Sequence, residues 1–412
     1  MIGVSLIVGC APGPAATVTT PSATTVASGP AATSPTATSV ATAPASLSRS
    51  PTPTAAFAGP MDLVRVTVPQ DFTYVVLPYG KDGAGRAIFR LVLLDLSAAR
   101  VVEVGRVAVD VPPGSQAAPD LVASASRDGR VLVLTATMPS GATTIYAVRP
   151  ESAAFTQLAA EPSHYATAVV SPDGASFAFT RVSLDPAVHG IWIGPTTGGS
   201  QRQLVRDTPQ TVPPMALGFS DDAAWLAFDV TLGEGDVLVG VVRPTGSARV
   251  DRPARALVGD GRLLGPGSQV DWRGGETALL VRSSRSLFGG QNSVTAYDVV
   301  SGRARELYRP TTSVVIDHAL WHPALDRFVE LERPECCGIT GDIVWLRYLD
   351  GRAPVKLVDS VLIGTPWWSR DGSRLFAIGG GDDSVGGVTD LLTRQGVLMF
   401  CKRSVGPPGP CT

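Results

Sequence analysis

A turn motif recurs between apolar segments along this chain and limits the folds that it can adopt. It is clearest in VVSPDGASFAFTR (169–181) and WWSRDGSRLFAIG (367–379), where Asp-Gly follows an anchor serine and precedes an apolar, strand-like segment. Glycine accepts the positive φ of a tight turn, so each copy predicts two antiparallel strands joined by that turn. Six copies align on one anchor position, with steps of 45, 49, 52, 50 and 47 residues between Ser126, Ser171, Ser220, Trp272, His322 and Ser369.

Two further strands are expected after each turn, for example in IWIGPTTGGSQRQL (191–204). Four strands in each repeat of near-constant period predict a β-propeller, whose sheets pack face to face around an axis. Residues 62–107 supply four more expected strands without the Asp-Gly turn. We therefore expect an all-β fold, a single β-propeller of about seven four-stranded blades. A ring of six, with the N-terminal strands closing the last blade, is the alternative.

The Ser-Pro-Asp-Gly turn at 171–174, with the strand and the second hairpin that follow, resembles the TolB-type, WD-repeat-like propeller repeat. The resemblance is also good over 369–375. It weakens where Asp-Ala replaces Asp-Gly after Ser220, and where Trp272 and His322 replace the anchor serine. It covers most of residues 61–403, and it implies a propeller fold.

The N-terminus, MIGVSLIVGC, is an apolar run that ends in cysteine. Residues 7–10, Ile-Val-Gly-Cys, resemble the lipobox of bacterial lipoproteins, which implies a lipid on Cys10 after cleavage behind Gly9. No Lys or Arg precedes the run, so we expect the true start to lie upstream. An apolar N-terminus that ends in Gly-Cys by chance is the alternative.

Residues 11–60 form a segment of low complexity, in which 41 of 50 residues are Ala, Thr, Ser or Pro. Such a segment buries too little apolar surface to offset the entropy of ordering it, so we expect a disordered linker. We predict four parts: signal remnant and lipobox (1–10), linker (11–60), propeller (61–403) and C-terminal tail (404–412). This layout predicts an extracytoplasmic protein held on the bacterial membrane by a lipid at Cys10.

The formal net charge of −2 gives no basic surface of the kind that binds nucleic acid. The sequence contains neither a G-x-S-x-G nucleophile motif nor H-E-x-x-H, and it ends soon after the last expected strand, so we expect no peptidase domain. We predict a binding module for a protein, peptide or glycan, with no catalytic residue and no cofactor. A hydrolase or lyase with its site at the channel mouth and a structural envelope component are the alternatives.

The residues best placed for a ligand face are few. We expect His189 in a loop within its blade and His164 and His318 between blades, where all three would open on one face of the ring; solvated loop histidines are the alternative. Asp382 and Asp383 stand on a glycine-rich loop that offers oxygen ligands of the type calcium uses, but without the regular spacing of calcium loops. We therefore predict no metal site.

Four cysteines remain if Cys10 carries lipid, and an even number in an exported protein favours disulfides. A bond between Cys401 and Cys411 would close the tail. Alternatively, Cys336 or Cys337 pairs with one of these two. A bond between the adjacent Cys336 and Cys337, or a zinc site of four thiolates, is a further alternative.

Overall fold

The structure is a computed structural model. It describes residues 59–112, 119–161, 168–208, 213–231, 237–267, 269–273, 277–282, 292–310, 314–324, 326–334, 342–361, 366–379 and 385–401. Within these residues one short 3-10 helix, Pro150–Ser152, accompanies the strands, and no helix is long and apolar enough to cross a membrane.

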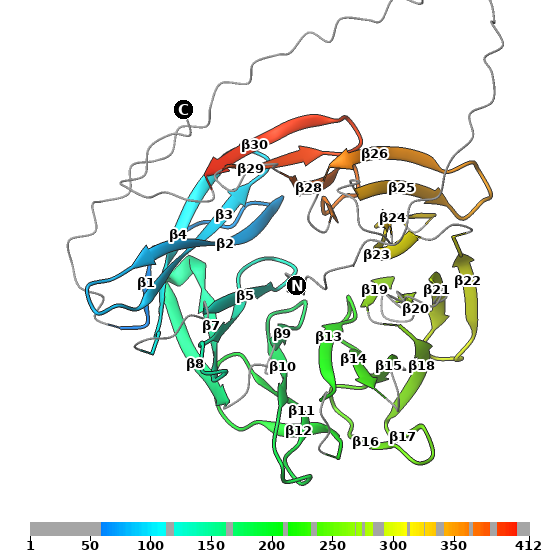
Figure 1. Cartoon of the computed structure of the whole chain (residues 1–412), viewed down its shortest axis with the longest axis horizontal. Coiled ribbons are helices and arrows are strands. Elements are labelled where there is room, and N and C mark those ends of the chain that lie inside the picture. Colours follow the sequence, from blue (N-terminus) through cyan, green and yellow to red (C-terminus); the bar gives the residue numbers. More distant parts are fainter. Residues whose placement is uncertain are drawn as a thin grey trace, which may run out of the picture. The chain divides into compact units, whose positions relative to one another are not determined.

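Hydrogen bonding divides the described strands into seven sheets, which surround a common axis (Figure 1). We number these blades one to seven in chain order. Blades one and two contain β1 (Met61–Leu63), β2 (Phe72–Lys81), β3 (Ala87–Asp95) and β4 (Arg100–Val109), then β5 (Asp120–Ala125), β6 (Leu132–Thr137), β7 (Thr143–Arg149) and β8 (Ala154–Glu161). Blades three and four contain β9 (Ala168–Val170), β10 (Ser176–Arg181), β11 (Gly190–Pro195) and β12 (Arg202–Arg206), then β13 (Met215–Phe219), β14 (Leu226–Thr231), β15 (Val237–Val242) and β18 (Gly261–Pro266).

Blades five to seven repeat the same up-and-down order. Their strands are β19 (Gln269–Arg273), β20 (Thr277–Arg282), β21 (Ser293–Asp298) and β22 (Ala304–Tyr308), then β23 (Val314–Trp321), β24 (Arg327–Pro334), β25 (Asp342–Tyr348) and β26 (Val355–Val361), then β27 (Trp367–Trp368), β28 (Leu375–Gly379), β29 (Val385–Asp390) and β30 (Gln395–Cys401). The predicted all-β propeller is therefore confirmed.

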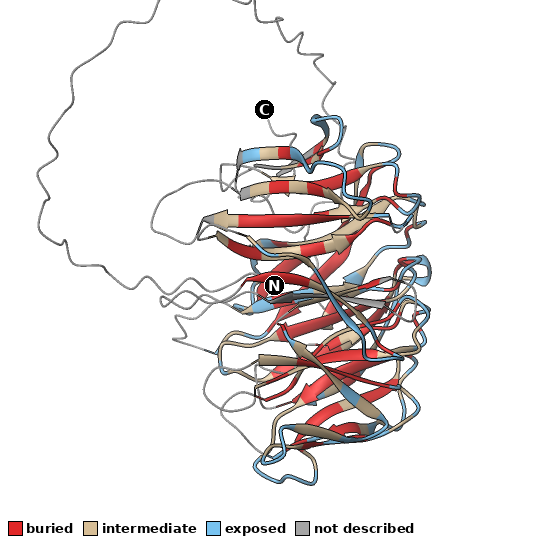
Figure 2. Ribbon diagram, turned by 90° about the vertical axis from the view of Figure 1, so that its right-hand side faces the viewer, coloured by how far each residue is buried: buried red, intermediate tan, exposed pale blue. Residues whose placement is uncertain are grey.

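The core lies between neighbouring blades, where the buried residues concentrate (Figure 2). Val133 and Ile145 of blade two, for example, pack with Phe177 and Phe179 of blade three, and all four are at most 1% exposed. Burying large side chains on both faces of each sheet stabilises the ring, because apolar area is removed from water between every pair of blades.

The recurrent turn has the same hydrogen bonds in four blades. In blade three, the Ser171 hydroxyl donates to Asp173 Oδ1 at 2.6 Å and accepts the amide of Ser176 at 2.9 Å. Equivalent bonds hold the turns that begin at Ser126, Ser220 and Ser369. At the position of the turn glycine, Ala223 has φ of 59°, so the alanine adopts the same left-handed conformation.

Blade one differs in the direction of its innermost strand. The inner strands of blades two to seven end at the anchor turns, whereas β2 begins on that side of the ring and runs away from it. Phe72 at the start of β2 packs over the turn of blade two, where a Cβ on Gly129 would lie 2.4 Å from its ring. The Tyr74 hydroxyl donates to the Gly129 carbonyl at 2.8 Å. These contacts join blade one to blade two without an anchor turn, because the Asp82-Gly83 pair of blade one lies in the β2–β3 turn at the other end of the strands.

A hairpin of blade four crosses to blade three. It consists of β16 (Ala248–Asp251) and β17 (Ala256–Gly259), which lie between β15 and β18 in sequence but pair with β12 as strands five and six of the blade-three sheet. The pairing of β12 with β16 is parallel. We call this hairpin the strap, because it covers the outer edge of one blade while belonging to the next.

Candidate functional site

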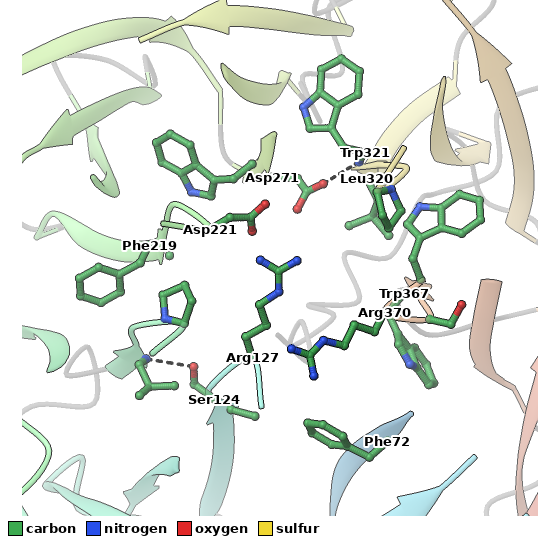
Figure 3. A pocket seen from close by; sticks show the side chains of 18 of the residues that line it. Phe72, Ser124, Arg127, Phe219, Asp221, Asp271, Leu320, Trp321, Trp367 and Arg370 are labelled. Atoms are coloured by element: carbon green, nitrogen blue, oxygen red, sulfur yellow. Dashed lines mark hydrogen bonds between the residues drawn. The ribbon is translucent and has the colours of Figure 1, made fainter. Parts of the chain in front are cut away.

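A pocket of about 830 Å³ lies at the axis of the ring, on the side of the anchor turns. Residues from all seven blades line it, and Figure 3 labels several of its charged and aromatic side chains. It therefore has the size of a ligand site and the central position where short segments of every blade meet.

The pocket-lining residues occupy fixed positions of the repeat. The anchor residue itself is buried, and the residue directly after it lines the pocket in five blades, as Arg127, Pro172, Asp221, Pro323 and Arg370. The residue directly before it lines the pocket in six blades, as Ala125, Val170, Phe219, Asp271, Trp321 and Trp368. These positions vary in chemistry, while four of the six anchor residues are serine. The residues on either side of each anchor are therefore the sequence signal that could have predicted the site.

Arg127 and Arg370 are exposed and extend into the pocket (Figure 3). The main-chain amide of Arg127 donates to the Pro172 carbonyl at 2.9 Å. The main-chain amide of Arg370 donates to Asp71 Oδ1 at 3.4 Å. Within the part of the chain that the structure describes, neither guanidinium forms an ion pair. The turns thus fix the backbone of two cations whose charged ends are open to a ligand.

Most acidic residues of the pocket come from blades four and five, and Asp71 of blade one adds a further carboxyl group beside the Arg370 amide. Asp271 Oδ2 accepts the main-chain amide of Trp321 at 2.6 Å, and burial raises the pKa of Asp271 to about 7, with a further contribution from the charge of Asp221. The Arg127 side chain points toward Asp221 and Asp271 (Figure 3). Asp222 accepts a hydrogen bond from the Ser220 hydroxyl of its own turn at 2.7 Å. The positive charge of Arg127 therefore offsets part of the negative charge that Asp221 and Asp271 bring to the pocket.

Tryptophans form much of the wall. Trp272 and Trp321 are only 7% and 5% exposed, and Trp321 makes an edge contact with Phe328, with ring centroids 6.2 Å apart. Trp367 packs on Phe376 at 5.8 Å. The indoles are thus parts of the core whose edges reach the pocket, and their fluorescence should report on what enters it.

His322 also lines the pocket, but both nitrogens of its ring make contacts within the fold. Its Nδ1 accepts the Ala324 amide at 3.0 Å, its Nε2 lies 2.9 Å from the Gly372 carbonyl, and it meets Trp368 edge-on at 4.5 Å. Burial lowers its pKa. The histidine therefore takes over the role of the anchor serine and stays neutral.

The structure brings neither His189 nor His318 to this pocket. His189 is fully buried at the opposite end of its blade, where its Nδ1 accepts the Ser183 amide at 3.2 Å and burial lowers its pKa, so the solvated-loop interpretation is wrong for it. The expectation that His318 lies between blades is also wrong, because it belongs to β23. There its Nδ1 lies 3.5 Å from Asp317 Oδ2.

The other predicted residues lie outside the described residues, namely Cys10, His164, Cys336, Cys337, Asp382, Asp383 and Cys411. Cys401 ends β30, and only its backbone is described. Within the described ranges, no group of three His, Cys, Asp or Glu residues could hold a metal ion.

No family model matches the chain, and no curated protein matches it. It is similar in structure to a prolyl endopeptidase, with a TM-score of 0.51 and 14% identity over 80% of this chain and 50% of that one. The chain therefore spans half the length of that enzyme. Other similar structures are an oligogalacturonate lyase in complex with manganese (TM-score 0.47, 11% identity, 80% and 85% covered) and a putative TolB from Agrobacterium tumefaciens (0.42, 16%, 71% and 97%).

These similarities concern the fold alone. TolB and other propeller proteins are among the similar structures, as the repeat resemblance implies. The strand pairing itself defines the protein as a β-propeller with a central pocket.

Proposed function

We propose that this propeller is a binding module and that its ligand, a protein, peptide or glycan, enters the central pocket on the anchor-turn side. One observation carries the proposal. The chain places arginines, aspartates and tryptophans at the repeat positions that meet at the axis, while the neighbouring anchor positions serve the turns. Rigid turns that carry variable side chains are how propellers and similar scaffolds present binding sites.

Binding can be tested by the fluorescence of the pocket tryptophans. A ligand in the pocket should change the indole emission of the full chain and raise its melting temperature, since a ligand at about 100 times its Kd adds about 2.7 kcal/mol to the free energy of unfolding. A ligand that raises the melting temperature and leaves the tryptophan emission unchanged would place the site elsewhere.

The proposal includes an extracytoplasmic position, with the propeller joined to a membrane through a lipid on Cys10. It is supported by the lipobox-like residues 7–10 and the Ala/Thr/Ser/Pro-rich segment that follows. Substitution Cys10→Ser should move the full-length protein from the membrane fraction to the soluble fraction. Mass spectrometry that finds no acyl group on Cys10 of the unmodified protein would contradict this part.

A hydrolase or lyase is the second candidate, because Asp271 is a pocket carboxyl whose pKa of about 7 suits proton transfer near neutral pH. Under this alternative, Asp271→Asn abolishes turnover and leaves ligand affinity nearly unchanged. Under the binding-module proposal, the purified protein shows no turnover of the ligands that it binds.

A further inference from the structure

Two arginines and four aspartates line the pocket, and Asp71 and Asp222 accept hydrogen bonds from anchor turns. Arg370 reaches the pocket from blade seven, beside Trp367, and no acid among the described residues forms an ion pair with its guanidinium. Arg127 instead points toward Asp221 and Asp271. Guanidinium groups bind carboxylates through two parallel hydrogen bonds, which are about twice as strong as hydrogen bonds between neutral groups.

The rings around the pocket favour a peptide over a glycan. Sugars need an aromatic face that is open for stacking, whereas Trp272 and Trp321 are more than nine-tenths buried. Trp367 contacts Phe376, and Trp368 contacts His322, so these indoles are also engaged in the core. Recognition in this pocket must therefore rely mainly on charge and hydrogen bonds.

We infer that the ligand is an acidic peptide segment, and that Arg370 and Arg127 bind its carboxylate in the central pocket. The inference rests on the proposed function and names the chemistry of the ligand. The carboxylate comes from an Asp or Glu side chain or from a chain end, and Arg370 is its main partner because the charge of Arg127 is partly offset by Asp221 and Asp271.

The experiment uses the full chain and labelled octapeptides of Ala and Ser that carry none, one, two or three Glu residues. Matched peptides carry Gln in place of Glu, and each exists with a free and an amidated C-terminus. Anisotropy gives the affinity, and tryptophan emission reports on the pocket. A uronic-acid tetrasaccharide with three carboxylates is tested in parallel, since it offers the same charge on a sugar.

We expect affinity to rise with the number of Glu residues and to fall with added salt. Arg370→Gln should weaken binding about tenfold or more, the loss expected for one charged hydrogen-bonding partner, and Arg127→Gln should weaken it less. Arg305→Gln is the matched control, because Arg305 is an exposed arginine on the outer strand β22, and it should bind as the wild type does.

Equal binding of the Glu and Gln peptides overturns the inference, and so does unchanged affinity in both pocket variants. Binding of the uronic acid alone overturns the choice of a peptide. These failures differ from failure of the proposed function. If neutral peptides or sugars bind and change the tryptophan emission, the pocket is a binding site with a different chemistry. If nothing tested changes that emission, the proposed function fails as well.

Discussion

Glu330 is a buried carboxyl at the packing face between blades five and six. It is 0% exposed, its Oε1 accepts Arg347 Nε at 2.5 Å, and Glu332 lies on the same strand, 3.8 Å from the Arg347 guanidinium. Tyr308 of blade five donates its hydroxyl to Glu332 at 2.6 Å. Two carboxyl groups thus share one arginine, and burial raises the pKa of Glu330 to about 8.

This shift has a definite consequence for stability. The folded protein holds a proton on Glu330 between the ordinary Glu pKa of 4.5 and about 8, while the unfolded chain has lost it. Folding stability therefore falls as pH rises through this window. We predict that Glu330→Gln, which cannot ionise, lowers this pH dependence, so that the variant gains melting temperature over the wild type from pH 5 to pH 9. A constant difference across that range would contradict the assignment.

The anchor serine is the second residue whose role can be tested. Ser171 is 1% exposed and bonds both Asp173 and the Ser176 amide, so removing its hydroxyl takes the side-chain acceptor from the Ser176 amide, while Asp173 keeps the Ala175 amide. Ser171→Ala should lower the free energy of unfolding by about 1–3 kcal/mol, measured by denaturant titration. Ser200→Ala, an exposed position of the same blade, is the control and should change little.

At the scale of the elements, a buried ion pair holds the strap against blade three, and its contribution to stability can be tested. Asp207 has a fully buried side chain after β12, and Arg252 of the strap donates Nε to its Oδ1 at 2.9 Å and Nη1 to the Thr231 carbonyl at 2.5 Å. Arg252→Ala would leave a buried charge without its partner. This should cost about 3–5 kcal/mol of folding stability and expose residues 248–259 to proteolysis.

The control for the strap is the exposed ion pair of Arg352 with Asp350, in the turn before β26. Arg352→Ala should leave both unfolding and proteolysis unchanged, because solvent screens exposed pairs. A strap that remains resistant to protease in Arg252→Ala would show that the strand pairing with β12 suffices without the ion pair.

The elements also show what sequence alone can predict. The period of the anchor turn located the inner hairpin of six blades correctly, even where Trp272 or His322 replaces serine, because the apolar strands and the spacing persist. The strap could not be predicted in this way, since its parallel pairing to a neighbouring blade leaves no local pattern. The pocket was not predicted, because the ligand face was inferred from histidines expected in loops at the opposite end of the strands. Arg127, Asp221 and Arg370 each directly follow an anchor serine, so the repeat itself marks their positions.

At the scale of the whole molecule, the closure of the ring is distinctive. Blade one is built from residues 61–109 and blade seven from 367–401, and no described sheet combines strands from both ends. Side-chain packing closes the ring instead, with Leu77, Val92 and Leu94 against Phe376, Val388 and Leu398. We call this contact the seam.

Because the seam depends on apolar packing, a cavity there should weaken the ring. Leu94 is 0% exposed, and Leu94→Ala should cost about 2–5 kcal/mol of folding stability. Hydrogen exchange should increase in blades one and seven together, more than in blades three and four. Val258→Ala, at a 47% exposed position of the strap, is the control. Faster exchange in blade one alone would show that the seam is not what couples the two blades.

We propose that ligands bind in the pocket at the axis, beside Arg127 and Arg370. The most direct test is a thermal-shift screen of the full chain with acidic and neutral peptides, glycans and divalent metals, run in parallel on the Arg127→Gln/Arg370→Gln double variant. We expect acidic peptides to raise the melting temperature of the wild type and to have little effect on that of the double variant. A ligand that stabilises both proteins equally would contradict it.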